Sequence, residues 1–204
     1  MGFISDSRNV VPVAVVGNQQ TESVNEGPKI ITSGGAKFVS PKTVAIYGVL
    51  TALTAAITVM TVIPFPPTKG YFNLGEALVF FSAFTFGWRA GAICGGVGSA
   101  MADLILGFGM FAPTTLAAKG TEGLVAGIVG RLNGGKPWAY ALGIGCGGAC
   151  MVTIYFLSEW LVLGMGLGTA IAEIPTNIAQ VTIGGTVGTL LSYSVKRSLP
   201  SLGK

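Results

Sequence analysis

The chain has 204 residues, of which 10% are charged and 50% are hydrophobic, and its formal net charge is +4. Soluble domains carry about 25% charged residues, so this composition, with a mean hydropathy of +0.69, excludes an ordinary soluble protein and indicates a membrane protein. The sequence contains no histidine, which excludes a serine–histidine catalytic pair and the usual histidine-ligated zinc sites.

The first 40 residues contain no long apolar run, so we expect residues 1–40 to form a disordered cytoplasmic tail. Six apolar segments follow, at about 43–63, 74–88, 90–107, 114–130, 138–160 and 169–194. A helix needs roughly 20 apolar residues to cross a bilayer. The sequence therefore predicts an all-α membrane protein, with a bundle of six transmembrane helices in residues 41–197 and a short cytoplasmic tail at 198–204.

Turn-forming stretches separate these segments, among them "PFPPTKGYF", "GFGMFAP" and "RLNGGKP". The second and third segments meet at "FGWRAG", where we expect Trp88 and Arg89 to lie at a membrane interface. Pro175 is expected near the start of the sixth helix, where a missing N–H is tolerated.

Lysine and arginine residues indicate the orientation, because cytoplasmic loops are enriched in them. With the N-terminus in the cytoplasm, ten basic residues fall on the cytoplasmic side, and only Lys69 and Lys119 fall on the outer side. Both termini are therefore expected to be cytoplasmic. The same topology places all acidic residues of the apolar segments near the outer side: Glu76, Asp103, Glu122, Glu159 and Glu173.

Polar side chains within these segments recur at helical spacing. Lys119 and Glu122, in "LAAKGTEGLVAG", are three residues apart and can pair on one helix face. The sixth segment carries a polar stripe in "EIPTNIAQ", and "YFNLGE" adds polar and aromatic side chains before the second segment. A charge at the bilayer centre costs about 2.5–3.5 kcal/mol, and ion pairing or a water-filled cavity must offset this cost. The convergence of these polar and aromatic side chains therefore indicates a small-molecule pocket near the outer mouth of the bundle.

The candidate substrate-binding residues are the polar residues that this topology places near the outer mouth: Asn73, Glu76, Lys119, Glu122, Asn177, Gln180, Asp103 and Glu173. Each of them can instead join helices through hydrogen bonds, which average about 0.6 kcal/mol in membranes. Asp103 can brace a neighbouring helix, and Glu159 is interpreted as an interfacial residue. We expect no catalytic residues, no cofactor and no metal site.

Small residues recur every four positions in two segments. Gly48, Ala52 and Ala56 form such a face in the first segment, and either packing within the chain or docking of a partner explains it. Gly91, Gly95 and Ser99 do the same in the third segment, where we expect internal packing.

Three stretches, in order, resemble a known family: "YFNLGEALVFFSAFTFGWRAGAICGGVGSAMADLILG", "FAPTTLAAKGTEGLVAGIVG" and "EIPTNIAQVTIGG". They are similar to the substrate-binding S components of energy-coupling-factor (ECF) transporters, in the branch of the riboflavin- and hydroxymethylpyrimidine/pyridoxine-type components. The resemblance covers about residues 43–197 and leaves the first 40 outside it.

This resemblance implies a six-helix protein of the cell membrane that captures a vitamin or related micronutrient at the extracellular face and has no ATPase of its own. The implied partners are a transmembrane coupling subunit and two cytoplasmic ATPases, with no nucleic acid. Ala52 and Ala56 fit the family's contact with the coupling subunit. The implied binding pairs lie in the three quoted stretches: Asn73 and Glu76, Lys119 and Glu122, Asn177 and Gln180.

The residues alone are also compatible with other functions. A stand-alone proton-coupled carrier of a small polar solute would use the acidic residues as proton relays, and a structural membrane protein would use them only for assembly. An enzyme has the least support. Five acids against one or two lysines near the outer mouth favour a cationic or amine-bearing heterocycle over a dianion, unless these charges pair internally.

Overall fold

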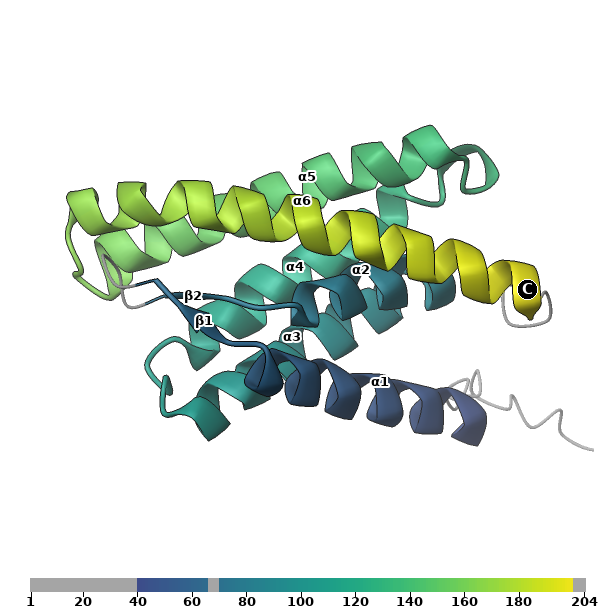
Figure 1. Ribbon diagram of the computed structural model, residues 1–204, viewed down its shortest axis with the longest axis horizontal. Coiled ribbons are helices and arrows are strands. Elements are labelled where there is room, and N and C mark those ends of the chain that lie inside the picture. The colour runs from purple at the N-terminus through teal and green to yellow at the C-terminus, as the bar shows by residue number, and fades with distance from the viewer. Residues whose placement is uncertain (1–39, 66–69, 200–204) are drawn as a thin grey trace, which may run out of the picture. The chain divides into compact units, whose positions relative to one another are not determined.

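The computed structural model describes residues 40–65 and 70–199 (Figure 1). The expected tails, 1–40 and 198–204, and the outer Lys69 lie largely or wholly outside these residues. The described part contains six α-helices: α1 (Pro41–Met60), α2 (Gly75–Phe86), α3 (Trp88–Leu106), α4 (Ala112–Val129), α5 (Pro137–Leu157) and α6 (Leu167–Ser198). A short antiparallel hairpin, β1 (Ile63–Pro64) and β2 (Tyr71–Phe72), joins α1 to α2.

Local sequence explains where the helices begin and end. Pro41 and Pro137 occupy the first turns of α1 and α5, where no backbone N–H is needed. Gly87 separates α2 from α3 with a φ of 97°, and Gly107 ends α3 with a φ of 83°. These left-handed conformations favour glycine, and they confirm the predicted breaks at "FGWRAG" and "GFGMFAP".

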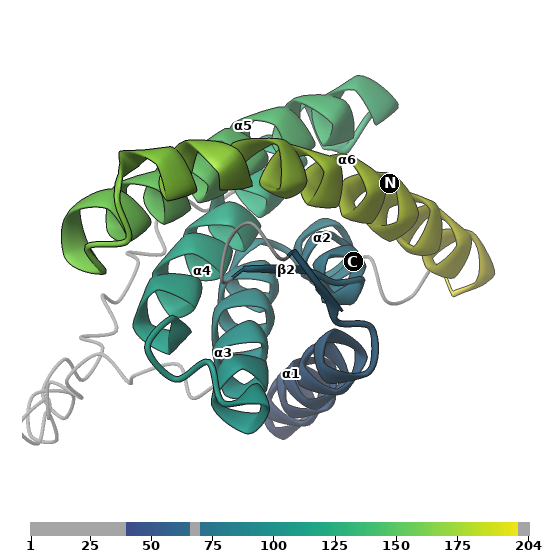
Figure 2. The same ribbon diagram turned by 60° about the vertical axis from the view of Figure 1, so that its left-hand side comes forward.

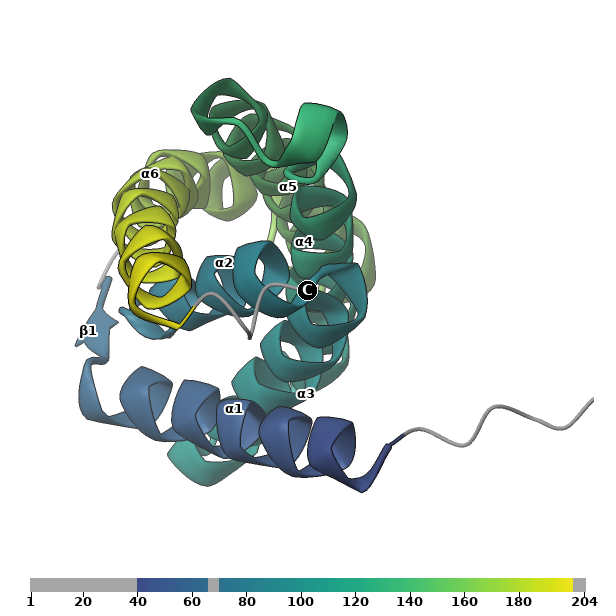
Figure 3. The ribbon, with the colours of Figure 1, turned by 90° about the vertical axis from the view of Figure 1, so that its right-hand side faces the viewer.

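The short helix α2 lies at the centre of the bundle, enclosed by the other helices (Figure 3). Its 12 residues extend about 18 Å, too short to cross a hydrocarbon core of about 30 Å. Among the described residues, three helical segments are long and apolar enough to span a membrane: Pro41–Met60, Trp88–Leu106 and Pro137–Val162. The prediction of six helices is confirmed, but the helices differ in whether their length and composition allow them to cross a membrane.

Helix α6 is longer than its apolar segment, and it contains Pro175 in its interior. The expectation that Pro175 lies near the helix start is wrong, because Gly166, with a φ of 88°, begins the helix nine residues earlier. The proline leaves the carbonyl of Ile171 without its helical N–H partner. Membrane helices tolerate such a proline because neighbouring helices can satisfy the freed backbone group.

The two ends of the bundle differ in charge. One end, here called the basic end, holds six basic residues at helix ends and in the α4–α5 connection: Lys42, Arg89, Arg131, Lys136, Lys196 and Arg197. The other, the hairpin end, holds β1–β2 beside the α3–α4 and α5–α6 connections (Figure 2). Lys119 is the one lysine or arginine of the described residues that lies outside the basic end.

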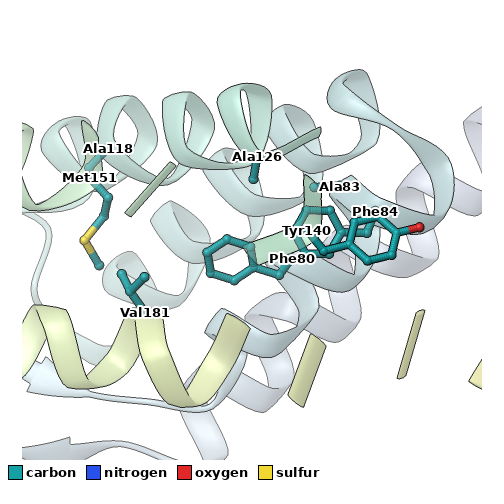
Figure 4. Packing of buried hydrophobic residues seen from close by; sticks show 8 residues of the cluster. All are labelled: Phe80, Ala83, Phe84, Ala118, Ala126, Tyr140, Met151 and Val181. Atoms are coloured by element: carbon teal, nitrogen blue, oxygen red, sulfur yellow. The ribbon is translucent and has the colours of Figure 1, made fainter. Parts of the chain in front are cut away.

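Close packing holds the helices together. Phe84 of α2 lies against Tyr140 of α5, with ring centroids 4.6 Å apart, and Phe80 follows at 5.8 Å from Phe84 (Figure 4). Between α3 and α4, a Cβ added at Gly91 would lie 2.5 Å from the carbonyl oxygen of Gly123. The expectation that the small-residue face of the third segment packs internally is confirmed.

The small-residue face of α1, in contrast, does not pack against another helix of the described residues. Gly48, Ala52 and Ala56 are all exposed, and a Cβ at Gly48 would meet nothing within 4 Å. The buried side of α1 carries Leu50 and Thr54 instead. Within the described part of the chain, packing between helices therefore does not account for this face.

Candidate functional site

A small cavity of about 40 Å³ lies at the hairpin end, and most of its lining is polar. Its walls come from β2 and from every helix except α1 and α2, together with the loop residue Asn73. The lining residues are Tyr71, Asn73, Ser99, Asp103, Phe111, Thr115, Lys119, Tyr155, Glu159, Glu173, Asn177 and Gln180. We call this the polar cavity.

Lys119 of α4 forms the centre of a buried network beside the polar cavity. Its ammonium group forms salt bridges with Glu76 of α2 and, at 3.2 Å, with Glu122 one turn further along α4. All three side chains are at most 3% exposed. The predicted Lys119–Glu122 pair is confirmed, and Glu76 is a second partner that lies 43 residues away in the chain.

The network extends from Glu76 to α6 and to the loop before α2. The Nε2 of Gln180 donates to Glu76 Oε2 at 3.1 Å, while Gln180 Oε1 accepts the backbone N–H of Asn73 at 3.1 Å. Gly184 makes room for this contact, because a Cβ there would lie 2.3 Å from Glu76 Cγ. Hydrogen bonds and salt bridges thus tie α2, α4, α6 and the hairpin connection together at one point.

The charges of the Lys119 network do not balance. One ammonium group can neutralise one of the two carboxylates, so the trio retains one negative charge or one acidic proton in excess. Oε1 of Glu76 and Oε1 of Glu122 are buried without a hydrogen-bond partner among the described residues. Such atoms are costly in a protein interior, and neither glutamate belongs to the lining of the polar cavity.

A second polar group lies on the α3 side of the cavity. The hydroxyl of Tyr71 donates a hydrogen bond to Asp103 Oδ1, and the hydroxyl of Tyr155 donates to Thr115 Oγ1 at 2.9 Å. Burial, the negative charge of Asp103 and this hydrogen bond together raise the pKa of Tyr71, which lies in β2 outside the helices. Tyr71 is therefore a neutral donor over the whole physiological pH range.

Two further carboxyl groups meet at the α5–α6 side. Glu159 lies in a short π-helix, Ser158–Val162, that continues α5, and Glu173 lies in the second turn of α6. They are 1% and 5% exposed and line the same cavity. The interpretation of Glu159 as an interfacial residue is wrong, because the π-helix at the end of α5 places its side chain inside the bundle.

The structure brings together all eight candidate residues at the hairpin end. Asn73, Glu76, Lys119, Glu122 and Gln180 are joined by direct contacts. Asp103, Glu173 and Asn177 line the cavity with Lys119. The expectation that the acids of the apolar segments gather at one end is confirmed for the described residues.

Sequence reasoning missed several lining residues: Ser99, Phe111, Thr115, Tyr155 and Glu159. Two signals could have revealed some of them. Thr115 precedes Lys119 by four residues and Tyr155 precedes Glu159 by four, so each pair shares a helix face. Phe111 lies in the connection before α4 and has no such periodic signal.

The sequence and the fold of this chain are similar to those of known transporter components. A family model described as "ECF-type riboflavin transporter, S component" matches residues 38–197. A Pyrococcus woesei protein, described only as an uncharacterized protein in a gap 3′ region, is 38% identical over 149 residues, which cover 71% of this chain and 97% of that protein.

Two further similarities agree with that model. The thiamine precursor transporter HmpT of Lactococcus lactis subsp. cremoris is 30% identical over 158 residues, covering 77% of this chain and 89% of the transporter. The solved structure of the S component of a bacterial ECF transporter superposes with a TM-score of 0.65 at 19% identity, covering 78% of this chain and 97% of that one. This last likeness concerns the fold.

Proposed function

The chain belongs to the ECF-type riboflavin transporter S component family, and on this premise we propose that its polar cavity binds a vitamin or vitamin precursor for uptake. S components are the substrate-binding membrane subunits of ECF transporters and are not enzymes. The observation that carries the proposal is the buried network of Lys119 with Glu76, Glu122 and Gln180, directly beside a cavity. Lys119 and Gln180 of this network line the cavity, where a polar ligand can reach them.

We further propose that the hairpin end faces the outside of the cell and that the basic end faces the cytoplasm. The segregation of Lys and Arg in the described residues supports this orientation, because cytoplasmic loops carry the excess of basic residues. All six helices then lie in the plasma membrane, and both chain termini are cytoplasmic. The ligand enters at the outer face, as capture from the medium requires.

The family assignment also favours import with partner subunits over a stand-alone proton-coupled carrier. The proposed partners are a transmembrane coupling subunit and two cytoplasmic ATPases. The exposed face of α1 formed by Gly48, Ala52 and Ala56 is the proposed contact with the coupling subunit. Small residues let two helices approach closely in a membrane, and within the described residues no other helix occupies this face.

Replacing Ala52 and Ala56 together by leucine is expected to abolish co-purification with the coupling subunit, because the larger side chains keep the partner helix at a distance. Ligand binding in detergent should remain unchanged, since the polar cavity lies on other helices. Gly145→Leu on α5 is a matched control, as a Cβ there meets nothing within 4 Å. Retention of the coupling subunit by the double variant would contradict the proposed contact.

Thermal stability of the purified protein against a panel of water-soluble vitamins and precursors tests the function itself. The panel contains flavins, thiamine and its pyrimidine, pyridoxine forms, biotin, folate and pantothenate. A ligand at about 1,000 times its dissociation constant stabilises by roughly 4 kcal/mol, a shift of roughly 8–16 °C for a chain of this size. Stabilisation by one class of compound supports the proposal, and the absence of any shift would contradict it.

A further inference from the structure

A second cavity, of about 550 Å³, lies at the basic end of the bundle, and we call it the basic cavity. Figure 3 looks onto this end, where α2 lies between α1 and α6. The walls come from α1, the end of α2, the α4–α5 connection, the start of α5 and the end of α6. Its charged and hydroxyl-bearing side chains are Thr43, Tyr47, Thr85, Arg131, Tyr140 and Lys196. None of the residues that line it also lines the polar cavity, so the two sites are separate.

The basic cavity contains positive charge without a counter-ion. Arg131 and Lys196 line it, whereas every carboxyl side chain of the described residues lies at the hairpin end. Arg131 forms no salt bridge or hydrogen bond with another described residue. The ammonium group of Lys196 contacts neutral acceptors, the carbonyl oxygen of Phe84 at 2.7 Å and the hydroxyl of Tyr140 at 2.8 Å. Neither cation is therefore neutralised within the described part of the chain.

Helix dipoles do not supply the missing negative charge. The C-terminal ends of α2, α4 and α6 lie at the basic end and attract cations there, but the N-terminal ends of α1, α3 and α5 lie at the same end and have the opposite sign. The two sets offset each other. Capping of the Phe84 carbonyl explains one contact of Lys196, and it does not explain Arg131.

Several hydrogen-bond donors of the lining have no acceptor within the described residues. An ammonium group has three N–H donors, and Lys196 uses two of them. Tyr140 is 8% exposed, and its hydroxyl oxygen accepts from Lys196, so its own O–H is left to donate. The guanidinium of Arg131 adds five further donors. Donors and positive charge together match an anion with several oxygen acceptors, such as a phosphate ester.

The depth and size of the basic cavity favour a lipid as the source of that phosphate. Thr43 lies in the first turn of α1, Lys196 in the last turn of α6, and Arg131 directly after α4, all at the helix ends where lipid headgroups lie. The volume of about 550 Å³ far exceeds the roughly 30 Å³ of a water molecule and is larger than a single inorganic anion needs. Ile46 and Phe86 add apolar lining, which suits the glycerol and the first part of an acyl chain.

We propose that the basic cavity binds the phosphate group of an anionic membrane lipid, with Arg131 and Lys196 as its charged contacts and the Tyr140 hydroxyl as a further donor. Basic pockets between membrane helices are known to hold anionic headgroups. Two cations without an acid repel the ammonium group of a zwitterionic headgroup, so the site selects phosphatidylglycerol over phosphatidylcholine. This site lies at the opposite end of the bundle from the polar cavity and goes beyond the function proposed above.

Thermal unfolding of the purified, delipidated full chain in a neutral detergent tests the proposal with three probes at constant ionic strength. They are phosphatidylglycerol, phosphatidylcholine and inorganic phosphate. At about 100 times its dissociation constant, phosphatidylglycerol is expected to raise the melting temperature by roughly 5–11 °C. Phosphatidylcholine should bind at least about 10-fold more weakly, and inorganic phosphate at the same concentration should give no shift, because it leaves the rest of the cavity unfilled.

Arg131→Gln and Lys196→Gln locate the contact. Each removes one charged donor group, so we expect the affinity for phosphatidylglycerol to fall by roughly 10- to 100-fold. Arg131 has no partner among the described residues, so its replacement should leave the melting temperature without lipid unchanged. Arg197→Gln is the charge-matched control, because Arg197 is adjacent to Lys196 on α6 but does not line the cavity. It should keep the affinity within about twofold of wild type.

Three results would overturn the proposal. Equal affinities for phosphatidylglycerol and phosphatidylcholine would remove the selection for an anionic lipid, and equal stabilisation by inorganic phosphate would remove the lipid as the source. An equal loss of affinity in Arg197→Gln and Arg131→Gln would show general attraction to the basic end instead of a site. Each of these results would leave vitamin binding at the polar cavity untouched, since the two cavities share no lining residue.

Discussion

Lys119→Met is expected to lower the melting temperature of the purified protein by roughly 6–20 °C, because removing one partner of a buried ion pair costs about 3–5 kcal/mol. The substitution preserves most of the side-chain volume but removes the charge that lies between Glu76 and Glu122. Both carboxyl groups are fully buried, at 1% and 0% exposure. They would then face each other without a cation and repel.

A triple variant separates charge from packing in this network. Lys119→Met combined with Glu76→Gln and Glu122→Gln contains no ionised group at the network, so most of the lost stability should return. Buried ion pairs can often be replaced by neutral groups of similar volume with little loss. If Lys119→Met alone melted within about 2 °C of wild type, the three side chains would not form the buried ion network described above.

Gly123→Val is expected to destabilise the protein by about 3 kcal/mol, at the upper end of the usual cost of overpacking. A Cβ at Gly123 would lie 2.2 Å from the carbonyl oxygen of Gly91 and 2.9 Å from its Cα. These are backbone atoms of α3, so no side chain can turn away, and the two helices must separate. Lys119 lies one turn from Gly123 on α4, and we therefore expect ligand affinity to fall as well.

Gly145→Val is the matched control for this prediction. It makes the same chemical change within an apolar helix, α5, but a Cβ at Gly145 meets nothing within 4 Å. Thermal unfolding of the two variants in the same detergent isolates the effect of the close approach. Equal melting temperatures for the two variants would contradict the direct contact between α3 and α4.

Much of the helical arrangement follows from the sequence. Glycine and proline mark the breaks, and the distribution of lysine and arginine predicted that the membrane acids gather at one end. The pairing of Lys119 with Glu122 was predictable because it depends only on helical spacing. The polar stripe of α6, with Glu173, Asn177 and Gln180, was visible for the same reason.

Other features depend on contacts that local sequence does not encode. The salt bridge from Lys119 to Glu76 joins residues 43 positions apart. Glu159 lies in a π-helix that continues α5, and nothing in the local sequence predicts this change of helix type. The central position of α2 was also hidden, because a helix that is apolar on all sides fits a lipid-facing span as well as the core of a bundle.

The most direct test of the account is equilibrium binding of the ligand that most stabilises the wild-type protein, measured on wild type and on the triple variant of Lys119, Glu76 and Glu122. The triple variant is expected to fold and yet to bind at least about 100-fold more weakly, because the cavity loses the charged group of Lys119 and the two carboxyl groups that position it. Affinity within about twofold of wild type would contradict the claim that this buried network belongs to the binding site of the transporter subunit.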